Sequence, residues 1–482
     1  MGSPIREYDS ARQRNVAFLL PILAIAAAVR FFGLFRHATM PDEAFTFYIS
    51  AHPWASLVAL LKTGDFHPPL IYAIGHVLFG FTSHAYVFRI VTAAFGCAGG
   101  AATFALANRT IPRFAGAAAL LVAICPVLVF YDRFFRMYAL LWSLCAVTWA
   151  VLLWALDEPK RAWRWVAYGL AACALLYSQY IAFFTMATQV AFVALRHRKA
   201  AGFWVATAVS WAAFCVWLPV FFVQYPLGGT AYNALHGNSW ELFMTPAIML
   251  VDGLPRAIEY SPITAVLLWA LLISGLCIAL THSRRIVAWL TAPLFLQLGY
   301  SLVSGKLLVG QRYLLQAIPV LVLLVFVALE RLGHTRARFM AVPLTAALSI
   351  SMLAGTVDKL FLPQYMQVDW TQYRAFIDSK VRTGDAVVLD GSMTYFVLVG
   401  SKAAAARPMF LIANRSDAAA LSVQAARYAR VWYIDYQSSL PDPQHVVFQT
   451  LKRTHLKRTS WRTTDAGYGD AVLTTLFERA LP

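Results

Sequence analysis

Charged residues are scarce in this chain of 482 residues. Only 13% of the residues are Asp, Glu, Lys or Arg, and 60% are hydrophobic, whereas a soluble domain carries about 25% charged residues. The mean hydropathy is +0.61. This composition excludes an ordinary soluble globular protein and indicates an α-helical polytopic membrane protein.

Several motifs of nucleotide and metal chemistry are also missing. The chain has no Walker A motif, no Gly-rich dinucleotide fingerprint and no H-E-x-x-H. D-x-D, the usual mark of a metal-bound nucleotide sugar, occurs in no segment that we place outside the cytoplasm. The six cysteines lie in apolar segments without C-x-x-C spacing, so we interpret them as buried small hydrophobic residues. No cofactor is indicated, and a divalent metal stays an open alternative.

Long apolar runs dominate residues 1–359. A spanning helix needs about 20 mostly apolar residues, and the first run is better interpreted as a retained helix than as a cleaved signal, because no small-residue cleavage site follows it. We count eleven candidate spans: 16–35, 86–107, 113–130, 137–156, 163–177, 180–195, 202–222, 262–280, 286–303, 313–329 and 339–356.

Basic residues are distributed unevenly among the joints between these spans. Sixteen lie in alternate joints: Arg6, Arg12, Arg14, Arg109, Arg113, Lys160, Arg161, Arg164, Arg196, Arg198, Lys199, Arg284, Arg285, Arg331, Arg336 and Arg338. The other short joints hold seven: Arg36, Lys62, Arg133, Arg136, Arg256, Lys306 and Arg312. The positive-inside rule then predicts a multi-pass membrane protein with a cytoplasmic N-terminus. This asymmetry explains the net charge of +17 without nucleic acid as a partner.

The character of the chain changes near residue 360. Residues 370–381 and 416–429 have helical patterns, whereas DAVVLD, RVWYIDY, AVLTTLF and the segment HVVFQTL favour strands. This alternation predicts a small α/β domain over 360–482. Eleven spans would place that domain outside the cytoplasm, together with a first loop over residues 36–85.

Two carboxylates, Asp42 and Glu43, stand at the start of that first loop. Side by side at a helix exit they could be interfacial solvation only, or they could supply a general base for an acceptor hydroxyl. Farther along, Asp65 and His67 precede a Pro-Pro pair that fixes a rigid turn. His67 is a candidate ligand of a phosphate oxygen or a metal, and Asp65 its support.

Two arginines in a very short outside joint run against the charge rule. Arg133 and Arg136 follow Asp132, and guanidinium groups bind phosphate oxygens well. Pairing with nearby carboxylates is the structural alternative. The sequence also places basic and supporting side chains elsewhere, in outside joints and in apolar helices: Lys306, Arg312, Arg30, Arg89 and Tyr138.

An ordered set of short segments resembles a known family. Arg30 in the first helix is followed by PDEAFTFY, DFHPPLIYAIGHVLFG, FRIVTAAFG, FYDRFFRMYALL and QRYLLQAIPVLVLL. This order resembles the C-type (GT-C) membrane glycosyltransferases, and within them the bacterial branch of protein O-mannosyltransferases and lipid A aminoarabinose transferases. The match covers about residues 1–330. Relatives carry an acidic residue before the segment RMYAL of this chain, where Phe134 and Phe135 stand, and the oligosaccharyltransferase signature W-W-D-Y-G is absent.

The resemblance implies a GT-C fold with interfacial helices in the first loop and a polyprenyl-phosphate sugar as donor. It makes Asp42 the general base and Glu43 its neighbour. We therefore expect an inverting glycosyltransferase that acts outside the cytoplasm on a hydroxyl of a lipid, glycan or protein acceptor. Donor phosphate would be held by Arg133, Arg136, Lys306, Arg312, His67 and Tyr138. A membrane transporter or lipid flippase is the alternative, although inverted repeats and broken midplane helices are not evident.

Overall fold

The computed structural model describes residues 4–36, 41–226, 240–281, 285–306, 308, 310–332, 339, 341–361, 370–390, 408–412, 415–436, 442, 444–455, 457–464 and 471–479. The chain divides into two units, which we describe separately. The first comprises Met1–Leu34 and Pro53–Leu360, and the second comprises Phe35–His52 and Phe361–Pro482. The basic residues Arg284, Arg336 and Arg338, used above for orientation, lie outside the described residues.

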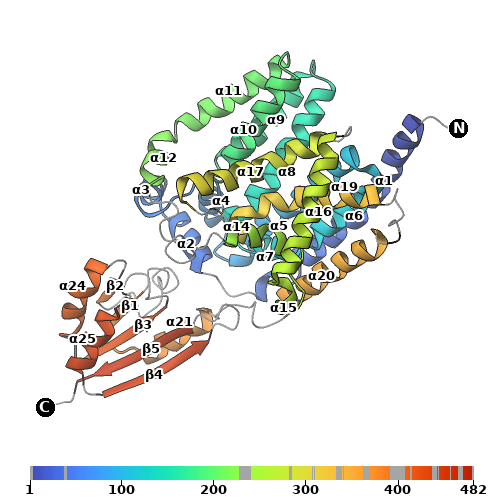
Figure 1. The fold of residues 1–482 in the computed structure, drawn as a ribbon. Coiled ribbons are helices and arrows are strands. Elements are labelled where there is room, and N and C mark those ends of the chain that lie inside the picture. The colour runs from blue at the N-terminus through green and yellow to red at the C-terminus, as the bar shows by residue number, and fades with distance from the viewer. Residues whose placement is uncertain are drawn as a thin grey trace. The chain divides into compact units, whose positions relative to one another are not determined.

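Helices build the first unit throughout its described part (Figure 1). They are α1 (Pro4–Phe31), η1 (Leu34–Arg36, at the boundary), α3 (Trp54–Gly64), α4 (Leu70–Phe79), α5 (Ala85–Thr110), η2 (Pro112–Phe114), α6 (Ala115–Ala123), α7 (Pro126–Asp132), α8 (Met137–Asp157), α9 (Ala162–Leu176), α10 (Ala182–Arg196), α11 (Ala201–Cys215), α12 (Leu218–Gln224), α14 (Trp240–Ile248), α15 (Arg256–Glu259), α16 (Pro262–Thr281), α17 (Arg285–Ser304), α18 (Gln311–Leu314), η3 (Leu315–Ala317), α19 (Ile318–Leu332) and α20 (Ala341–Phe361).

Six helical stretches in the described chain are long and apolar enough to cross a membrane: α5, α8, α16, α17, the continuous stretch Gln311–Leu332 and Val342–Phe361 of α20. Two bent helix pairs raise this number to eight if each pair is one span. The bend is 52° where Pro126 begins α7, and 63° between α11 and α12. A proline at the second break, Pro219, lies in the first turn of α12, and proline interrupts helical hydrogen bonding at such breaks. The chain is a multi-pass membrane protein.

Three of the eleven expected spans correspond to apolar helices of only 15 residues. The apolar part of α1 covers Ala17–Phe31, and α9 and α10 have 15 residues each. Conversely, α4 is an additional apolar helix, Leu70–Phe79, that we did not count as a span. The number of eleven spans therefore stays a prediction.

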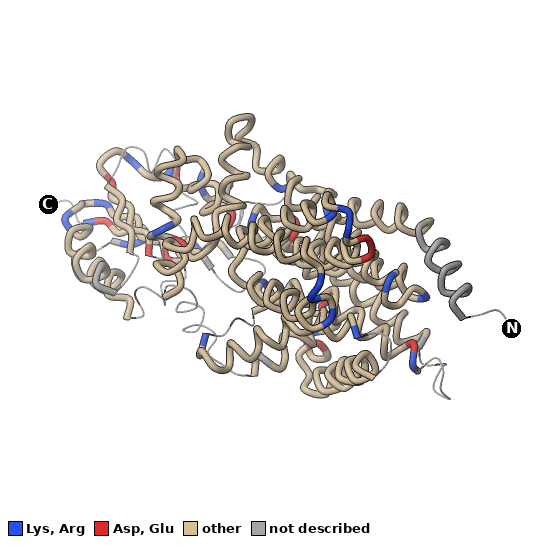
Figure 2. The backbone as a smooth tube through the Cα atoms, turned by 90° about the horizontal axis from the view of Figure 1, so that it is seen from above, with Lys and Arg blue, Asp and Glu red and all other residues tan. Residues whose placement is uncertain are grey.

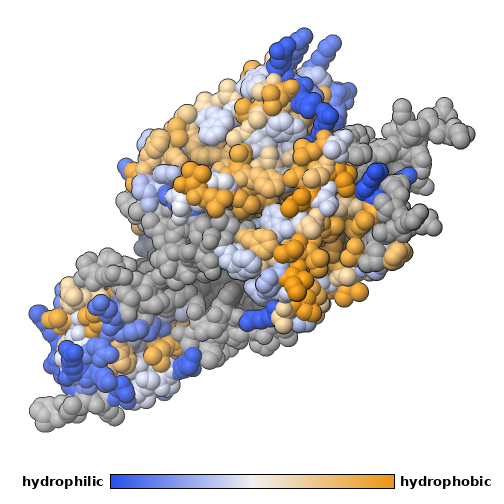
Figure 3. Space-filling model, viewed as in Figure 1, coloured by the Kyte–Doolittle hydropathy of each residue, from blue (hydrophilic) through white to orange (hydrophobic). Residues whose placement is uncertain are grey.

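The surface of the helical unit agrees with burial in a bilayer. Charged residues are sparse along its helices in Figure 2, and apolar side chains cover much of its surface in Figure 3. Large side chains such as Ile263 and Leu267 of α16, and Val303 of α17, are exposed. Exposed apolar surface of this extent is expected where lipid replaces water as the solvent.

The second unit is an α/β fold with a mixed five-stranded sheet. Its helices are α2 (Pro41–Ser50), α21 (Trp370–Lys380), α24 (Arg415–Ala425) and α25 (Val446–Thr454). Its strands are β1 (Ala386–Asp390), β2 (Met409–Ile412), β3 (Arg430–Asp435), β4 (Lys457–Thr464) and β5 (Ala471–Glu478), in the order β2-β1-β3-β5-β4. β1 runs parallel to β2 and β3, whereas β5 is antiparallel to β3 and β4.

Alternate residues of the central strands serve two separate cores. Val387 and Leu389 of β1 pack with Tyr373 and Ile377 of α21, and Ala44 of α2 belongs to the same cluster. Ala386 and Val388 belong to the opposite cluster, which contains residues of α24 and α25. This alternation follows from the two-residue period of a strand. The packing of Ala44 in the first cluster explains why α2, far away in the sequence, groups with the C-terminal unit.

The segment HVVFQTL is a helix, so our strand prediction for it was wrong. It forms most of α25, in which Val447 and Leu451 are buried one turn apart. The Asp442 carboxylate accepts hydrogen bonds from the backbone N–H groups of Val446 and Val447, both at 2.9 Å, which satisfies the first turn. A short apolar run has no periodicity that separates a strand from a buried helix.

Candidate functional site

Asp65 and His67 form a buried pair between α3 and α4. His67 Nδ1 lies 2.8 Å from Asp65 Oδ1, and both residues are 3% exposed. Burial raises the pKa of Asp65, but the charge and hydrogen bond of His67, with the charge of Arg136, outweigh it, so that the pKa lies below its usual value. Burial lowers the pKa of His67, and the charges of Arg136 and Arg312 lower it further. The Asp65 carboxylate raises it, but the net shift of the His67 pKa is downward. The pair therefore favours the charged carboxylate, while burial and the two arginines disfavour the imidazolium.

Tyr72 of α4 joins this pair to Arg136. The Tyr72 hydroxyl donates a hydrogen bond to Asp65 Oδ2 and accepts one from the Arg136 guanidinium at 3.1 Å. Arg136 is the N-cap residue of α8, and its guanidinium carbon lies 6.0 Å from the ring centre of Tyr138. We name His67, Asp65, Tyr72 and Arg136 the His67 network.

Gln224 of α12, together with Tyr180 before α10 and Trp217 before α12, holds the backbone of this network. Gln224 Nε2 donates to the carbonyl oxygens of Leu61, at 2.6 Å, and His67, at 3.4 Å. Tyr180 donates to the Gln224 side-chain oxygen and accepts from Trp217 Nε1 at 3.0 Å. The buried Gln224 amide fixes the Asp65–His67 turn, because leaving it unpaired would cost about 1–3 kcal/mol.

Two further cations lie near the same region of the first unit. Arg312 of α18 acts electrostatically on His67, and its guanidinium carbon lies 5.1 Å from the Tyr313 ring centre. Lys306 Nζ donates to the Tyr225 carbonyl oxygen at 2.7 Å and lies 3.9 Å from the Tyr225 ring centre. Tyr225 follows Gln224 directly, which connects Lys306 to the α12 end of the same region.

Arg30 and Asp132 form a fully buried ion pair. Arg30 Nε lies 2.8 Å from Asp132 Oδ2, and both side chains are 0% exposed. The other carboxylate oxygen accepts from Trp142 Nε1 at 2.7 Å, while Arg30 also donates to the Ala123 carbonyl oxygen at 2.7 Å. Asp132 therefore joins α1, α7 and α8 and is a structural partner of Arg30.

Arg133 and Arg89 support the C-terminal end of α1. Arg133 donates to the carbonyl oxygens of Val29, Arg30 and Phe32, at 2.6–3.3 Å. Arg89 donates to the Leu34 carbonyl oxygen at 2.9 Å. Both side chains are buried. Basic side chains at a helix C-terminus satisfy its last carbonyl groups, so Arg133 has a structural role here, and its part in phosphate binding stays a prediction.

Asp42 and Glu43 occupy the first turn of α2, a favourable place for carboxylates near a helix N-terminus. Glu43 is fully buried and Asp42 is partly exposed. Helix α2 belongs to the second unit, whereas the His67 network belongs to the first. The catalytic role of Asp42 thus stays a prediction, which we take up below.

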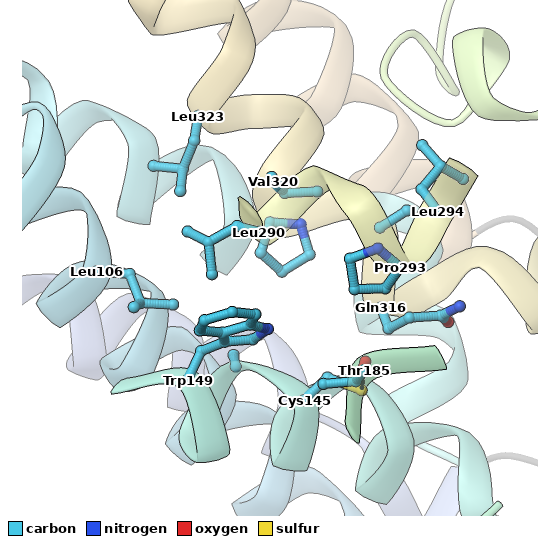
Figure 4. A pocket seen from close by; sticks show the side chains of 13 residues that line it. Leu106, Cys145, Trp149, Thr185, Leu290, Pro293, Leu294, Gln316, Val320 and Leu323 are labelled. Carbon is cyan, nitrogen blue, oxygen red and sulfur yellow. Dashed lines mark hydrogen bonds between the residues drawn. The ribbon is translucent and has the colours of Figure 1, made fainter. Parts of the chain in front are cut away.

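A small cavity lies among α5, α8, α10, α17, η3 and α19 (Figure 4). Its lining is mostly apolar, including Leu106, Trp149, Leu290 and Val320. Three residues of α8 line the cavity, and Cys145 is the one nearest to Arg136 in the sequence. At 1.5 Å per residue, Cys145 lies about 14 Å along the helix from Arg136.

Metal-ligating groups do not converge in the described chain. Within it, no group of three or more His, Cys, Asp or Glu side chains is close enough to hold a metal ion. The Asp65–His67 pair alone is a weak metal signature.

Sequence patterns did not single out Tyr72 or Gln224. Tyr72 lies in an apolar helix, where an aromatic residue is usually core, and Gln224 is 157 residues from His67. The only sequence signal for Tyr72 is its spacing of seven from Asp65, which becomes informative once a helix is known to start at Leu70.

Comparison with family models and with curated protein sequences gives no match. Solved structures do match. ArnT from Cupriavidus metallidurans in the apo state superposes with a TM-score of 0.54 at 14% identity, covering 96% of this chain and 98% of that chain. The same protein bound to undecaprenyl phosphate gives 0.51 at 15% identity, covering 95% and 97%. The oligosaccharyltransferase AglB from Archaeoglobus fulgidus, in complex with an inhibitory peptide and a dolichol-phosphate, gives 0.52 at 12% identity, covering 87% and 69%. Over nearly its whole length, this chain has the predicted GT-C fold.

Proposed function

We propose that the protein is an inverting glycosyltransferase that moves a sugar from a polyprenyl-phosphate donor to a hydroxyl group of a cell-envelope acceptor. The observation that carries this proposal is the His67 network with Arg312: two guanidinium groups and an imidazole gather around the Asp65 carboxylate in the helical unit. In this group two guanidinium groups accompany one carboxylate, and positive charge of this kind beside a bilayer suits an anionic ligand. A lipid phosphate is an anion that reaches this place by diffusion in the membrane.

The cavity supports a lipid-linked donor. We place the phosphate between Arg136 and Arg312. Arg136 directly precedes α8, and Arg312 lies in α18, which η3 follows. Residues of both α8 and η3 line the cavity. The prenyl chain can then run along α8 into apolar surroundings. The folds of ArnT and AglB, described above in complexes with undecaprenyl phosphate and dolichol-phosphate, agree with a donor of this class.

In the proposed reaction Asp42 takes the proton of the acceptor hydroxyl while its oxygen attacks the anomeric carbon. The bond between that carbon and the phosphate oxygen breaks, and the lipid phosphate leaves with the negative charge. Arg136, Arg312 and His67 stabilise this charge, with Lys306, Arg133 and Tyr138 as further candidates. The proposal includes the orientation in the membrane: the N-terminus is cytoplasmic, and the reaction takes place outside the cytoplasm at the bacterial inner membrane.

The decisive experiment incubates the purified protein in lipid nanodiscs with labelled polyprenyl-phosphate sugars and an envelope extract. We expect release of lipid phosphate that depends on the acceptor. A flippase would instead move labelled lipid across a proteoliposome bilayer without releasing phosphate, and that result would overturn the proposal.

Arg136→Gln is expected to weaken binding of the donor phosphate. A hydrogen bond to a charged group contributes about 1.5–3 kcal/mol, or roughly 10–150-fold in affinity. The matched control is Arg109→Gln, which removes the same charge from an ion pair with Asp157 that is partly exposed to solvent. Equal donor affinity for the two variants in a fluorescent lipid-phosphate binding assay would contradict the assignment of Arg136.

Filling the cavity is expected to discriminate donors by chain length. Ala146 is buried and lines the cavity, so Ala146→Phe places a ring where the prenyl chain would lie. We expect about a tenfold loss of affinity for a long-chain polyprenyl phosphate, the equivalent of about 1.4 kcal/mol, and little change for a short-chain analogue that ends before the cavity. An equal loss for both chain lengths would show that the chain lies elsewhere.

A further inference from the structure

His67 differs from the other cations of the proposed phosphate site because its charge depends on pH. The groups that face it are Asp65 from its own turn, Tyr72 through Asp65, Arg136 before α8 and Arg312 of α18. From α12, the neutral Gln224 amide contacts the His67 carbonyl oxygen. Burial and the two arginines disfavour the imidazolium, and Asp65 favours it.

The contact with Asp65 determines which ring nitrogen carries a proton. Because the Asp65 carboxylate accepts, Nδ1 is the donor, and the neutral ring keeps its lone pair on Nε2. Among the described residues Nε2 has no hydrogen-bond partner. A lone pair on Nε2 would repel a phosphate oxygen, so an anionic ligand and the neutral ring do not match.

We propose that the donor phosphate binds together with one proton: Nε2 of His67 takes a proton from water and donates it in a hydrogen bond to a phosphate oxygen, while Asp65 is the positioning residue that holds Nδ1. This inference rests on the proposed function and deepens it. The proton comes from bulk solvent, and it returns there when the lipid phosphate leaves the site. No covalent bond other than N–H is made or broken in this step.

The sign of the pH dependence follows from linkage. The free site has a His67 pKa below its usual value, and a bound negative charge raises that pKa. Between the two values, binding takes up protons, so affinity rises as pH falls, by at most about tenfold per pH unit. Above the pKa of the complex and below the pKa of the free site, the affinity is constant.

The test uses the full-length protein in nanodiscs and a prenyl methyl phosphodiester as the probe. A phosphodiester lacks the second ionisation of a phosphate monoester near pH 6, so its own charge stays constant across the titration. Isothermal calorimetry in buffers of different ionisation enthalpy counts the protons directly. We expect uptake of between zero and one proton per ligand near pH 7, and about tenfold tighter binding at pH 6 than at pH 8.

Two variants separate titration from simple contact. His67→Gln keeps an N–H donor but does not titrate, so we expect no proton uptake and an affinity independent of pH. Asp65→Asn keeps an oxygen that accepts from Nδ1 but removes the charge that favours the imidazolium. We therefore expect the midpoint of its pH profile to move to lower pH, with tight binding retained at low pH, a shift that a merely structural role would not produce.

The outcomes distinguish the two proposals. If the wild-type protein does not bind the phosphodiester at any pH, the proposed function fails. If it binds and transfers sugar but takes up no proton, or if His67→Gln shows the same pH profile as the wild type, the proton-coupled binding is wrong and the glycosyltransferase proposal stands.

Discussion

Asp42→Asn is expected to lower sugar transfer by about 10²–10⁴-fold, the usual loss when a general base is removed. Asparagine has nearly the same shape as aspartate but cannot accept the hydroxyl proton. Donor binding should persist, because the phosphate contacts proposed above come from other residues. The measurements are the single-turnover rate of transfer and the affinity for labelled lipid phosphate.

The neighbouring carboxylate offers a matched control for this variant. Glu43 is fully buried, whereas Asp42 is partly exposed and can meet a substrate. We expect Glu43→Gln to retain at least about tenfold more transfer than Asp42→Asn, within the range that a supporting group rather than the base itself contributes. Near-normal transfer by Asp42→Asn, or the opposite ranking of the two variants, would remove Asp42 from the mechanism.

Asp132→Ala is expected to destabilise the protein by about 3–5 kcal/mol, because it leaves Arg30 as a buried charge without its counter-ion. Thermal unfolding in detergent, followed by size-exclusion chromatography of a fluorescent fusion, measures the loss. The double variant Arg30→Met with Asp132→Leu removes both charges and should recover most of it. A double variant as unstable as the single one would show that packing, and not charge, determines the cost.

Two glycines of α5 provide an independent check on the same ion pair. A Cβ atom on Gly96 would come within 2.3 Å of Asp132 Oδ2 and 2.6 Å of Arg30 Nε, whereas one on Gly100 would meet nothing within 4 Å. We expect Gly96→Ala to cost about 1–3 kcal/mol by overpacking. Gly100→Ala should be neutral or stabilising, since alanine favours a helix. Equal melting temperatures would contradict the close packing at Gly96.

The site residues that could be predicted are polar or charged residues at positions where the surrounding sequence is apolar or should lack a positive charge. Asp65 and His67 stood out beside two prolines, and Arg136 stood out as a cation in a joint that should lack one. Tyr72 could not be recognised, because its hydroxyl matters through hydrogen bonds with Asp65 and with Arg136, a residue 64 positions away. Arg133 and Arg136 looked equivalent in the sequence, since a guanidinium that binds phosphate and one that binds helix carbonyl groups have the same chemistry.

The fold was predictable to a similar degree. Apolar runs indicated the helices and their approximate positions, but the bends at Pro126 and between α11 and α12 divide two of them. In the second unit, β1, β3 and β5 lie where apolar strand patterns predicted them, whereas β4, with the sequence KRTSWRTT, has no apolar pattern. That strand is fixed by its pairing along the whole of β5, a non-local interaction that local sequence does not reveal.

The grouping of α2 with the C-terminal unit has a consequence for biosynthesis. Ala44 leaves the ribosome early, but Tyr373 and Ile377, which share its core cluster, are made roughly 330 residues later. At about 5–20 residues per second, that interval lasts about 15–65 seconds. During this time the membrane helices between them are synthesised while α2 still lacks its partners. The second unit can therefore complete its core only near the end of translation, and a prematurely terminated chain would carry an α2 segment without its packing partners, which proteolytic quality control can recognise.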